Sequence, residues 1–217
     1  MSLQIDWLGQ VPYGRALELQ KQAVEDRCAG RCGDRLFLLE HPPVVTFGRS
    51  GKPENLRVPE SELQARGIEL HHVARGGDVT FHAPGQLVGY AIVDLEARGK
   101  PDVVAWLRQL ESCLFDALAE LGVAGAAEPG KTGVYVAGAE PLRKLASIGV
   151  GVRRWVTFHG FALNVTLDPA SFDVIVPCGL EDVSMTSVAK ELGIAATPTL
   201  LMRSREAVAT AFARALP

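Results

Sequence analysis

The chain has 217 residues, 47% of them hydrophobic and 22% charged, which is ordinary for a folded protein with a substantial core. The formal net charge of −3 gives no overall attraction to nucleic acid or to an anionic membrane. No apolar run approaches the ~20 residues of a membrane span, and residues 1–10 lack the pattern of a secretory signal. We therefore expect a cytoplasmic protein whose cysteines are free thiols, because disulfides are rare in that compartment.

The first half of the chain predicts one long helix and several short strands. Apolar residues at helical spacing predict a helix over 13–28, and a shorter helix over 59–66 ends at Gly67. Strands are predicted over residues 36–39, 44–47, 68–73 and 87–95. Pro42 and Pro43 separate the first two strands, because proline cannot donate a hydrogen bond to a strand ladder.

The second half contains the clearest helical pattern. Apolar residues recur every three or four positions over 101–121, and Gly122 ends the helix. Small residues predict a loop over 124–130. Antiparallel strands are then predicted over 133–136, 146–152 and 155–165, with helices near 187–192 and 200–216. Clustered strands with helices at intervals indicate one mixed α/β (α+β) domain over residues 1–217.

A glycine-rich stretch over residues 75–86 is the first candidate for a binding site. Glycine lets the backbone approach a ligand closely, and Asp78, Thr80 and His82 alternate with Val79 and Phe81. An extended segment would thus present polar groups on one face and apolar groups on the other. The stretch matches neither the phosphate-loop nor the dinucleotide-binding pattern. A tight hairpin with a polar outer face is the alternative interpretation.

Cys178, between Pro177 and Gly179, is the candidate nucleophile, and Lys144 is its candidate activator. An isolated cysteine with a pKa of about 8.5 is only roughly 3% thiolate at pH 7. A neighbouring ammonium that lowered the pKa by about two units would make it mostly thiolate. Taken alone, however, most cysteines are packing residues and most lysines are solvated.

Four blocks in the same order resemble the lipoate-biosynthesis octanoyltransferases, which are octanoyl-[acyl-carrier-protein]:protein N-octanoyltransferases. The blocks are residues 75–86, 144–149, 158–164 and 177–179. Residues 40–48 also resemble the family's early segment, so the resemblance spans about residues 36–188. Ala83 departs mildly from the pattern, since a glycine is usual there. The fold implied is that of the biotin/lipoate protein ligase catalytic domain, a mixed sheet flanked by helices.

The resemblance implies transfer of an octanoyl group from octanoyl-acyl carrier protein to a specific lysine of a lipoyl domain. Cys178 would carry the acyl group as a thioester, and Lys144 would lower the pKa of its thiol. The family's substrate-contacting positions fall on Arg75, Gly76, Gly77, Asp78, Val79, Thr80, Phe81, His82, Ser147, Ile148, Gly149, Gly160, Phe161 and Ala162. Backbone N–H groups at 76–77 or at 178–179 are alternative donors to the oxyanion of the tetrahedral intermediate.

The acceptors implied are the lipoyl domains of 2-oxoacid dehydrogenase complexes and the glycine cleavage H protein. No cofactor, nucleic acid or membrane partner is implied. Two other functions stay open: an ATP-dependent lipoate or biotin protein ligase, and a non-catalytic homologue that binds lipoyl domains. The proline–cysteine–glycine motif at Cys178 favours transfer through a thioester over both.

Several other polar residues have two interpretations. His82 and His159 are as well explained by structural hydrogen bonds as by contact with substrate. Cys28 and Cys32, four apart on a predicted helix, have no second Cys or His pair at zinc spacing, so helix packing explains them better than a metal. The cationic residues Arg143, Lys144, Arg153 and Arg154 form either a docking surface for acidic carrier protein or a solvated edge.

Overall fold

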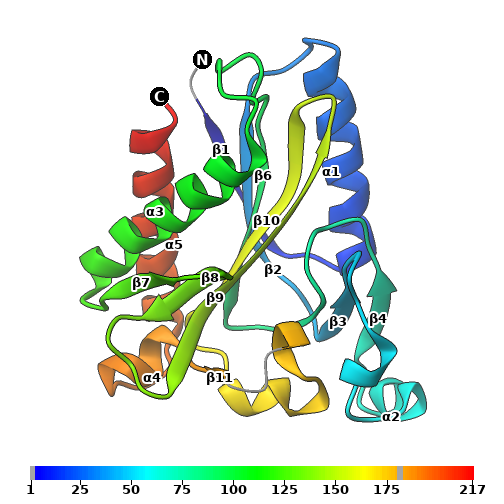
Figure 1. Cartoon of the computed structure of the whole chain (residues 1–217), viewed down its shortest axis with the longest axis vertical. Helices are drawn as coiled ribbons and strands as arrows, with labels where there is room; N and C mark the ends of the chain where they lie inside the picture. Colours follow the sequence, from blue (N-terminus) through cyan, green and yellow to red (C-terminus); the bar gives the residue numbers. More distant parts are fainter. Residues whose placement is uncertain (1–2, 180–182) are drawn as a thin grey trace.

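The computed structural model describes residues 3–179 and 183–217, apart from the side chain of Cys178. Over these residues the chain forms an eight-stranded sheet in the order β1-β2-β6-β10-β9-β8-β7, with β11 added beside β9 (Figure 1). Its strands are β1 (Gln4–Gln10), β2 (Arg35–Glu40), β6 (Gln86–Ile92), β7 (Gly125–Glu128), β8 (Lys131–Val136), β9 (Leu142–Arg153), β10 (Val156–Asn164) and β11 (Val183–Met185). The pairs β1–β2 and β9–β11 are parallel and the others are antiparallel, so the predicted mixed sheet is confirmed.

A smaller three-stranded sheet lies beside the large one. It is made of β3 (Val44–Phe47), β4 (Glu69–His72) and β5 (Val79–His82) in the order β4-β3-β5. The helices are α1 (Tyr13–Cys28), α2 (Glu60–Ala65), α3 (Val103–Leu121), α4 (Val188–Leu192) and α5 (Pro198–Ala215). Short 3-10 helices are formed by η1 (Pro53–Asn55), η2 (Pro169–Val174) and η3 (Pro177–Gly179).

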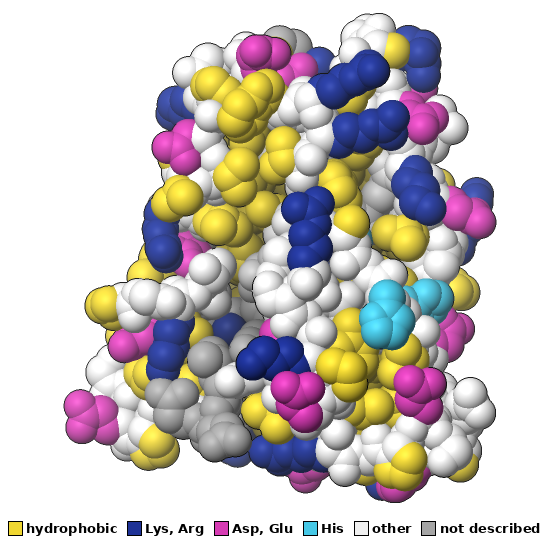
Figure 2. Space-filling model, turned by 45° about the vertical axis from the view of Figure 1, so that its right-hand side comes forward, with side chains coloured by type: hydrophobic (Ala, Val, Ile, Leu, Met, Phe, Trp, Pro, Cys, Tyr) yellow, Lys and Arg dark blue, Asp and Glu magenta, His cyan; other side chains and the backbone are white. Residues whose placement is uncertain are grey.

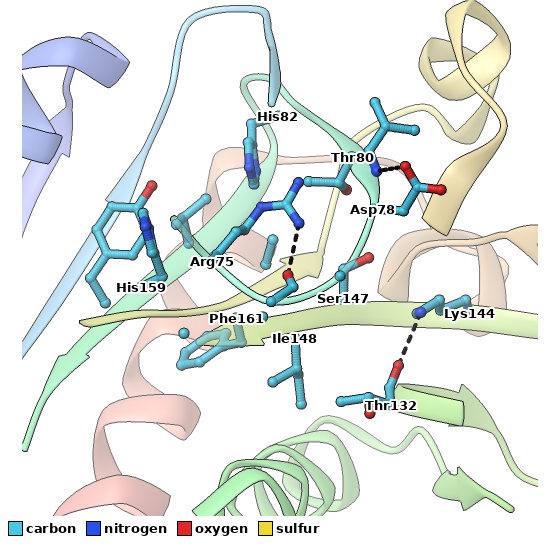
Figure 3. A pocket seen from close by; sticks show the side chains of 18 of the residues that line it. Arg75, Asp78, Thr80, His82, Thr132, Lys144, Ser147, Ile148, His159 and Phe161 are labelled. Atoms are coloured by element: carbon cyan, nitrogen blue, oxygen red, sulfur yellow. Dashed lines mark hydrogen bonds between the residues drawn. The ribbon is translucent and has the colours of Figure 1, made fainter. Parts of the chain in front are cut away.

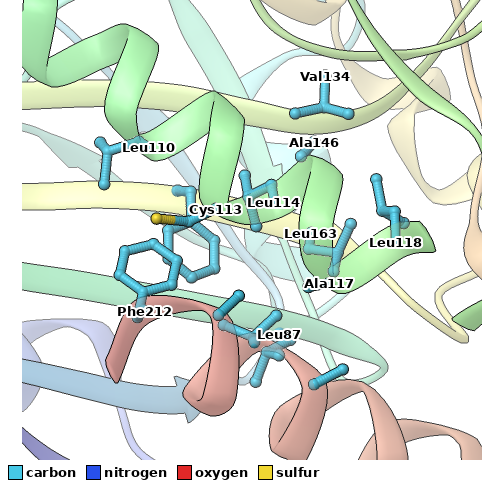
Figure 4. Close-up of a cluster of buried hydrophobic side chains, with 14 of the residues drawn as sticks. Leu87, Leu110, Cys113, Leu114, Ala117, Leu118, Val134, Ala146, Leu163 and Phe212 are labelled. Atoms are coloured by element: carbon cyan, nitrogen blue, oxygen red, sulfur yellow. The ribbon is translucent and has the colours of Figure 1, made fainter. Parts of the chain in front are cut away.

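Helices cover both faces of the large sheet because its central strands are apolar on both faces. In β2, Leu36 and Leu38 pack in the core under α3 and α5, whereas Phe37 and Leu39 pack in the core under α1. Figure 4 shows the first of these cores, where Leu114 of α3 and neighbouring side chains meet the sheet and α5. A strand buried on both faces reads as a continuous apolar run, which is the pattern of residues 36–39.

Helix α3 illustrates how local signals set the boundaries of an element. The buried side chains of α3, most of them apolar, recur every three or four residues and form one stripe along the helix, as the sequence predicts. The side chain of Asp102 accepts hydrogen bonds from the N–H groups of Val104 and Ala105 at the start. Gly122 ends the helix with a φ of 87°, a left-handed conformation that favours glycine.

The structure differs from several of the predictions. The segment predicted as a loop over 124–130 contains β7, which pairs with β8, and β1 was not predicted. The consecutive strands over 36–39 and 44–47 lie in different sheets, since β2 belongs to the large sheet and β3 to the small one. Cys32 lies beyond the end of α1, so it does not share a helix with Cys28. Lys144 is only 2% exposed, so it does not belong to a docking surface with Arg143.

The surface agrees with the small net charge. Figure 2 shows Lys, Arg, Asp and Glu side chains interspersed over one face, with apolar side chains between them. None of the helices formed by the described residues is long and apolar enough to span a membrane. Within the same residues, no cluster of three or more His, Cys, Asp or Glu side chains is placed to hold a metal ion.

A buried ion-pair network joins segments that are far apart in the sequence. The fully buried carboxylate of Asp34, just before β2, accepts from Arg27 at the end of α1 at 2.7 Å. Its other oxygen accepts from Arg98, in the loop before α3, at 2.6 Å. Arg27 also pairs with Asp94 at 3.2 Å. Each carboxylate thus compensates guanidinium charge that the fold has removed from water.

Replacing Asp34 by alanine should therefore lower the free energy of unfolding by about 3 kcal/mol or more, because buried guanidinium charge is left uncompensated. Denaturant unfolding at neutral pH measures the change. Arg15→Ala is the control, since Arg15 and Glu18 form an ion pair that is mostly exposed. The control should cost less than about 1 kcal/mol. Equal losses in the two variants would contradict the role assigned to the network.

Candidate active site

A pocket of about 230 Å³ lies between the large sheet and the segment that joins β4 to β5 (Figure 3). Strands β6, β9 and β10 form its floor, and residues 75–80 with His82 form the opposite wall. Every predicted substrate-contacting residue except Phe81 lines it. Phe81 points instead into the core of the small sheet, where its ring lies 5.8 Å from that of Phe172. The structure thus joins three of the four sequence blocks in one cavity.

The floor of the pocket is made of small residues paired across two strands. Gly149 of β9 lies opposite Gly160 of β10, and Ser147 lies opposite Ala162. A Cβ atom on Gly149 would lie 2.8 Å from the carbonyl oxygen of Gly76, so only glycine allows the wall to approach this closely. The N–H of Gly76 donates to the carbonyl of Val150 at 2.9 Å and holds the wall on the strand edge.

Lys144 lies at one end of this pocket because the ladder between β8 and β9 shifts register. Val134 pairs with Ala146, but the next residue of β8, Tyr135, pairs with Lys144. Leu145 is therefore an extra residue on β9, and both Leu145 and Ala146 pack in the core under α3. An extra residue of this kind reverses the alternation of side chains and can aim one at an active site. Lys144 consequently lines the same cavity as Ser147.

The ammonium group of Lys144 has specific partners. Its Nζ donates to the carbonyl oxygen of Thr132 at 3.1 Å, drawn as a dashed line in Figure 3. It also lies 5.2 Å from the centre of the Tyr135 ring, within the range of a cation–π interaction. A carbonyl oxygen and an aromatic face both favour the charged form of lysine, which offsets part of the cost of burying it.

The turn that contains Cys178 lies at the wall formed by Asp78. The side chain of Cys178 lies outside the described residues, so its distance to Lys144 stays a prediction. Around it, the N–H of Val176 donates to the carbonyl of Asn55 at 2.8 Å, and a Cβ on Gly179 would lie 2.7 Å from the Asp78 carboxylate. After it, β11 pairs directly with β9, with Met185 opposite Lys144.

Asp78 fixes this part of the wall through its own hydrogen bonds. Its carboxylate accepts from the backbone N–H groups of Lys52 at 3.0 Å and Val79 at 2.7 Å, and from the side-chain amide of Asn55. These contacts connect the turn after β3 with the start of β5 and with η1. Asp78 therefore orders the backbone around the pocket.

Two of the candidate oxyanion donors are already used within the protein. The N–H of Gly76 donates to Val150, and the N–H of Gly179 donates to the carbonyl of Val176 at 3.0 Å. The pairing of these two groups within the fold argues against them as oxyanion donors. The N–H groups of Gly77 and Cys178 stay predictions.

The end of the pocket opposite Lys144 is lined by aromatic rings that carry polar atoms. Burial lowers the pKa of His159 to about 3, assisted by the charges of Arg75 and Arg49. Burial also lowers the pKa of His82 well below its usual value. Burial raises the pKa of Tyr13 to about 12 and that of Tyr90 well above its usual value. All four rings are therefore neutral at pH 7.

Neighbouring amides fix the tautomer of His82. The side-chain nitrogen of Gln86 donates to the carbonyl of Phe81 and, at 2.9 Å, to the side-chain oxygen of Asn164. The remaining oxygen of Gln86 must then accept, so His82 donates from Nδ1 at 2.7 Å. Its Nε2 is left as an acceptor. His82 and Asn164 thus both make structural hydrogen bonds, and His82 in addition lines the pocket.

The side chain of Arg75 lies in the pocket wall and joins two segments through hydrogen bonds. Its guanidinium donates to the carbonyl of Thr46 at 2.6 Å, to the hydroxyl of Thr46 at 3.0 Å and to the carbonyl of Gly76 at 3.1 Å. It thereby joins β3 to the glycine-rich stretch. Its charge also disfavours protonation of His82 and His159.

Sequence reasoning missed several residues that line the pocket. They are Tyr13, Val88, Tyr90, Gly130, Lys131 and Thr132, which come from α1, β6 and the hairpin between β7 and β8. Tyr13 and Tyr90 are aromatic residues with a polar atom, which is a weak signal by itself. The hairpin gave no signal, because small residues near Gly130 are typical of any turn.

Comparisons with known proteins agree with this geometry. The family model described as the lipoyl protein ligase A/B catalytic domain matches residues 12–213. An octanoyltransferase from Acidobacterium capsulatum is 46% identical over 93% of this chain and 85% of its own length. One from Geobacter metallireducens is 50% identical over 86% of this chain and 82% of its own length. The chain belongs to this family, and within it to the octanoyltransferases.

Solved structures confirm the fold expected for an octanoyltransferase. A bi-partite lipoate protein ligase from Thermoplasma acidophilum matches with a TM-score of 0.72 at 16% identity, over 100% of this chain and 84% of the other. A biotin protein ligase from Aquifex aeolicus matches with a TM-score of 0.54 at 11% identity, over 98% of this chain and 72% of the other. At these identities the likeness shows the fold alone.

The neutral histidines predict how the stability of this octanoyltransferase depends on pH. Burial lowers the pKa of His41 to about 4, below its usual value of 6.5, and that of His159 to about 3. Between pH 6.5 and about 4 these histidines become protonated in the unfolded chain but stay neutral in the folded protein. The free energy of unfolding should therefore fall as the pH falls, and this contribution ends below the folded pKa values.

His41→Gln should make this dependence shallower, by up to about 1.4 kcal/mol per pH unit, because one ring no longer titrates. Denaturant unfolding at several pH values between 6.5 and 4 measures the slope. His72→Gln removes an exposed histidine and serves as the matched control. An unchanged slope in His41→Gln would contradict the assignment.

Proposed function

We propose that this protein transfers an octanoyl group from octanoyl-acyl carrier protein to a lysine of lipoyl domains, through a thioester on Cys178. The acceptors would be the lipoyl domains of 2-oxoacid dehydrogenase complexes and the glycine cleavage H protein. The octanoyltransferase relatives support the reaction class. The observation that carries the proposal is a buried lysine, Lys144, at one end of a pocket whose wall adjoins the turn of Cys178.

In the first half-reaction the Cys178 thiolate attacks the carbonyl carbon of the carrier-protein thioester. A new sulfur–carbon bond forms, the old one breaks, and the carrier thiol leaves and takes up a proton. The exchange of one thioester for another is nearly balanced in energy, so it requires no ATP. The positive charge of Lys144 would favour the thiolate over the thiol and raise its concentration at neutral pH. The backbone N–H groups of Gly77 and Cys178 would donate to the oxyanion.

The pocket supports an unbranched acyl chain as the group transferred. The glycine and alanine positions on β9 and β10 carry little or no side chain, so the floor of the pocket has room for an unbranched chain. Val88 and Ala162 lie side by side across β6 and β10 and give this floor an apolar surface. The rings at the far end are neutral, so no full charge from the histidines opposes an apolar chain.

In the second half-reaction the amine of the acceptor lysine attacks the Cys178 thioester. An amide bond forms, the sulfur–carbon bond breaks, and the cysteine leaves as a thiolate. The attacking amine must lose a proton. Once Cys178 is acylated, its negative charge is gone and a buried Lys144 ammonium becomes easier to deprotonate. Lys144 would then accept the proton and return to its charged form beside the new thiolate.

Incubation with octanoyl-acyl carrier protein in the absence of ATP should add one octanoyl group to Cys178, as the proposal requires a covalent intermediate. Mass spectrometry of digested protein locates the group, and later addition of a lipoyl domain should remove it. Cys178→Ala is the control and should abolish transfer while the far-ultraviolet circular dichroism stays unchanged. Transfer that depends strictly on ATP would overturn the proposal in favour of a ligase.

Lys144→Arg should separate the two roles of Lys144. Arginine keeps a positive charge but does not release a proton at neutral pH. We therefore expect the acyl-enzyme to form but its octanoyl group to pass to the lipoyl domain at least about 100-fold more slowly, the lower limit typical of losing a general base. Rapid-quench measurement of both half-reactions tests this. Normal transfer by Lys144→Arg would rule out proton transfer through Lys144.

A further inference from the structure

A single peptide group lies between Lys144 and a buried carboxylate outside the pocket. The carbonyl oxygen of Thr132 accepts from Lys144 Nζ at 3.1 Å. The N–H of Gly133, on the other side of the same peptide bond, donates to Oε1 of Glu111 at 3.1 Å. Glu111 belongs to α3 and is only 1% exposed, and it does not line the pocket.

The peptide group transmits position because it is rigid. Partial double-bond character keeps its six atoms close to one plane, with the C=O and N–H pointing in opposite directions in the trans form. An acceptor that fixes the direction of the Gly133 N–H therefore also fixes the direction of the Thr132 C=O. The carboxylate, the peptide dipole and the ammonium are then aligned with favourable signs.

Gly133 is fitted closely between its neighbours. Its φ of 126° lies in the region that side chains rarely adopt. A Cβ atom there would lie 2.6 Å from the carbonyl oxygen of Ala146 and 2.7 Å from Cε of Lys144. Little space is left for the peptide to rotate without displacing the lysine. A small displacement of Glu111 would therefore change the position of the Lys144 side chain.

We propose that Glu111 is a positioning residue for Lys144, acting through the peptide between Thr132 and Gly133 to hold the ammonium at the end of the pocket. This inference rests on the proposed function, in which Lys144 activates Cys178. The carboxylate is buried, so its negative charge is weakly screened and also favours a charged Lys144. Arg108 binds the other carboxylate oxygen, but its own side chain is half exposed.

Three variants separate this role from simple packing. Glu111→Gln keeps an oxygen that can accept from Gly133, whereas Glu111→Leu keeps a similar volume without an acceptor. Arg108→Ala breaks the other contact of Glu111 and is the matched control. A role in packing alone predicts that leucine is at least as good as glutamine, because buried ionic groups are often replaced by apolar ones without loss of stability.

The measurement is the pH dependence of alkylation of Cys178 by iodoacetamide, followed by residue-resolved mass spectrometry. Glu111→Leu should raise the apparent pKa of the Cys178 thiol by about one unit, which reduces alkylation about tenfold below that pKa. Glu111→Gln should stay within about threefold of the unmodified protein, and Arg108→Ala should not differ from it. Thermal unfolding checks that each variant is folded.

Lys144→Met, alone and combined with Glu111→Leu, separates the possible failures. If Lys144→Met shifts the profile and the double variant shifts it no further, Glu111 acts through Lys144 as proposed. If Lys144→Met shifts the profile but folded Glu111→Leu does not, the role of Glu111 is overturned and that of Lys144 stands. If Lys144→Met leaves the profile unchanged, the activation of Cys178 by Lys144 is overturned, and the role of Glu111 is overturned with it.

Discussion

The register shift between β8 and β9 is the constraint on which the rest of the site depends. With regular alternation, Lys144 would point with Ala146 and Ile148 into the core under α3 and α5. A charged ammonium in that apolar core would have no partner, and its burial would be prohibitive. The extra residue, Leu145, takes the core position instead and turns Lys144 toward the pocket. Pairing between two strands thus decides where the proposed catalytic cation, Lys144, lies.

Two cations in the pocket wall are held by defined partners. The guanidinium of Arg75 is held by Thr46, and the ammonium of Lys144 is held by Thr132 and the Tyr135 ring. The histidine and tyrosine rings at the end of the pocket opposite Lys144 are neutral because burial disfavours their charged forms. This arrangement leaves one end of the pocket suited to acid–base chemistry and the other suited to an uncharged group.

The site forms where two sheets meet. The small sheet supplies His82 and the glycine-rich wall, and the large sheet supplies the floor and Lys144. The hydrogen bond from Gly76, in the glycine-rich wall, to Val150 of β9 joins the two parts. Neither sheet contains a complete pocket, and helix α3 on the opposite face of the large sheet contributes through Glu111. The chemistry of the pocket is therefore coupled to the packing of the whole chain.

The sequence by itself determined the long helices, most of the strands and, through the family resemblance, most of the residues that line the pocket. Helical periodicity over 103–121 and apolar runs such as 36–39 are local signals, because they follow from burying a face of a single element. Only the tertiary structure decided which sheet each strand joined, that Phe81 faces a core, and that Lys144 is aimed inward by Leu145. The sequence also did not predict that the peptide between Thr132 and Gly133 links Glu111 to Lys144 through hydrogen bonds. Strand register and burial are set by residues distant in the chain, so no local pattern encodes them.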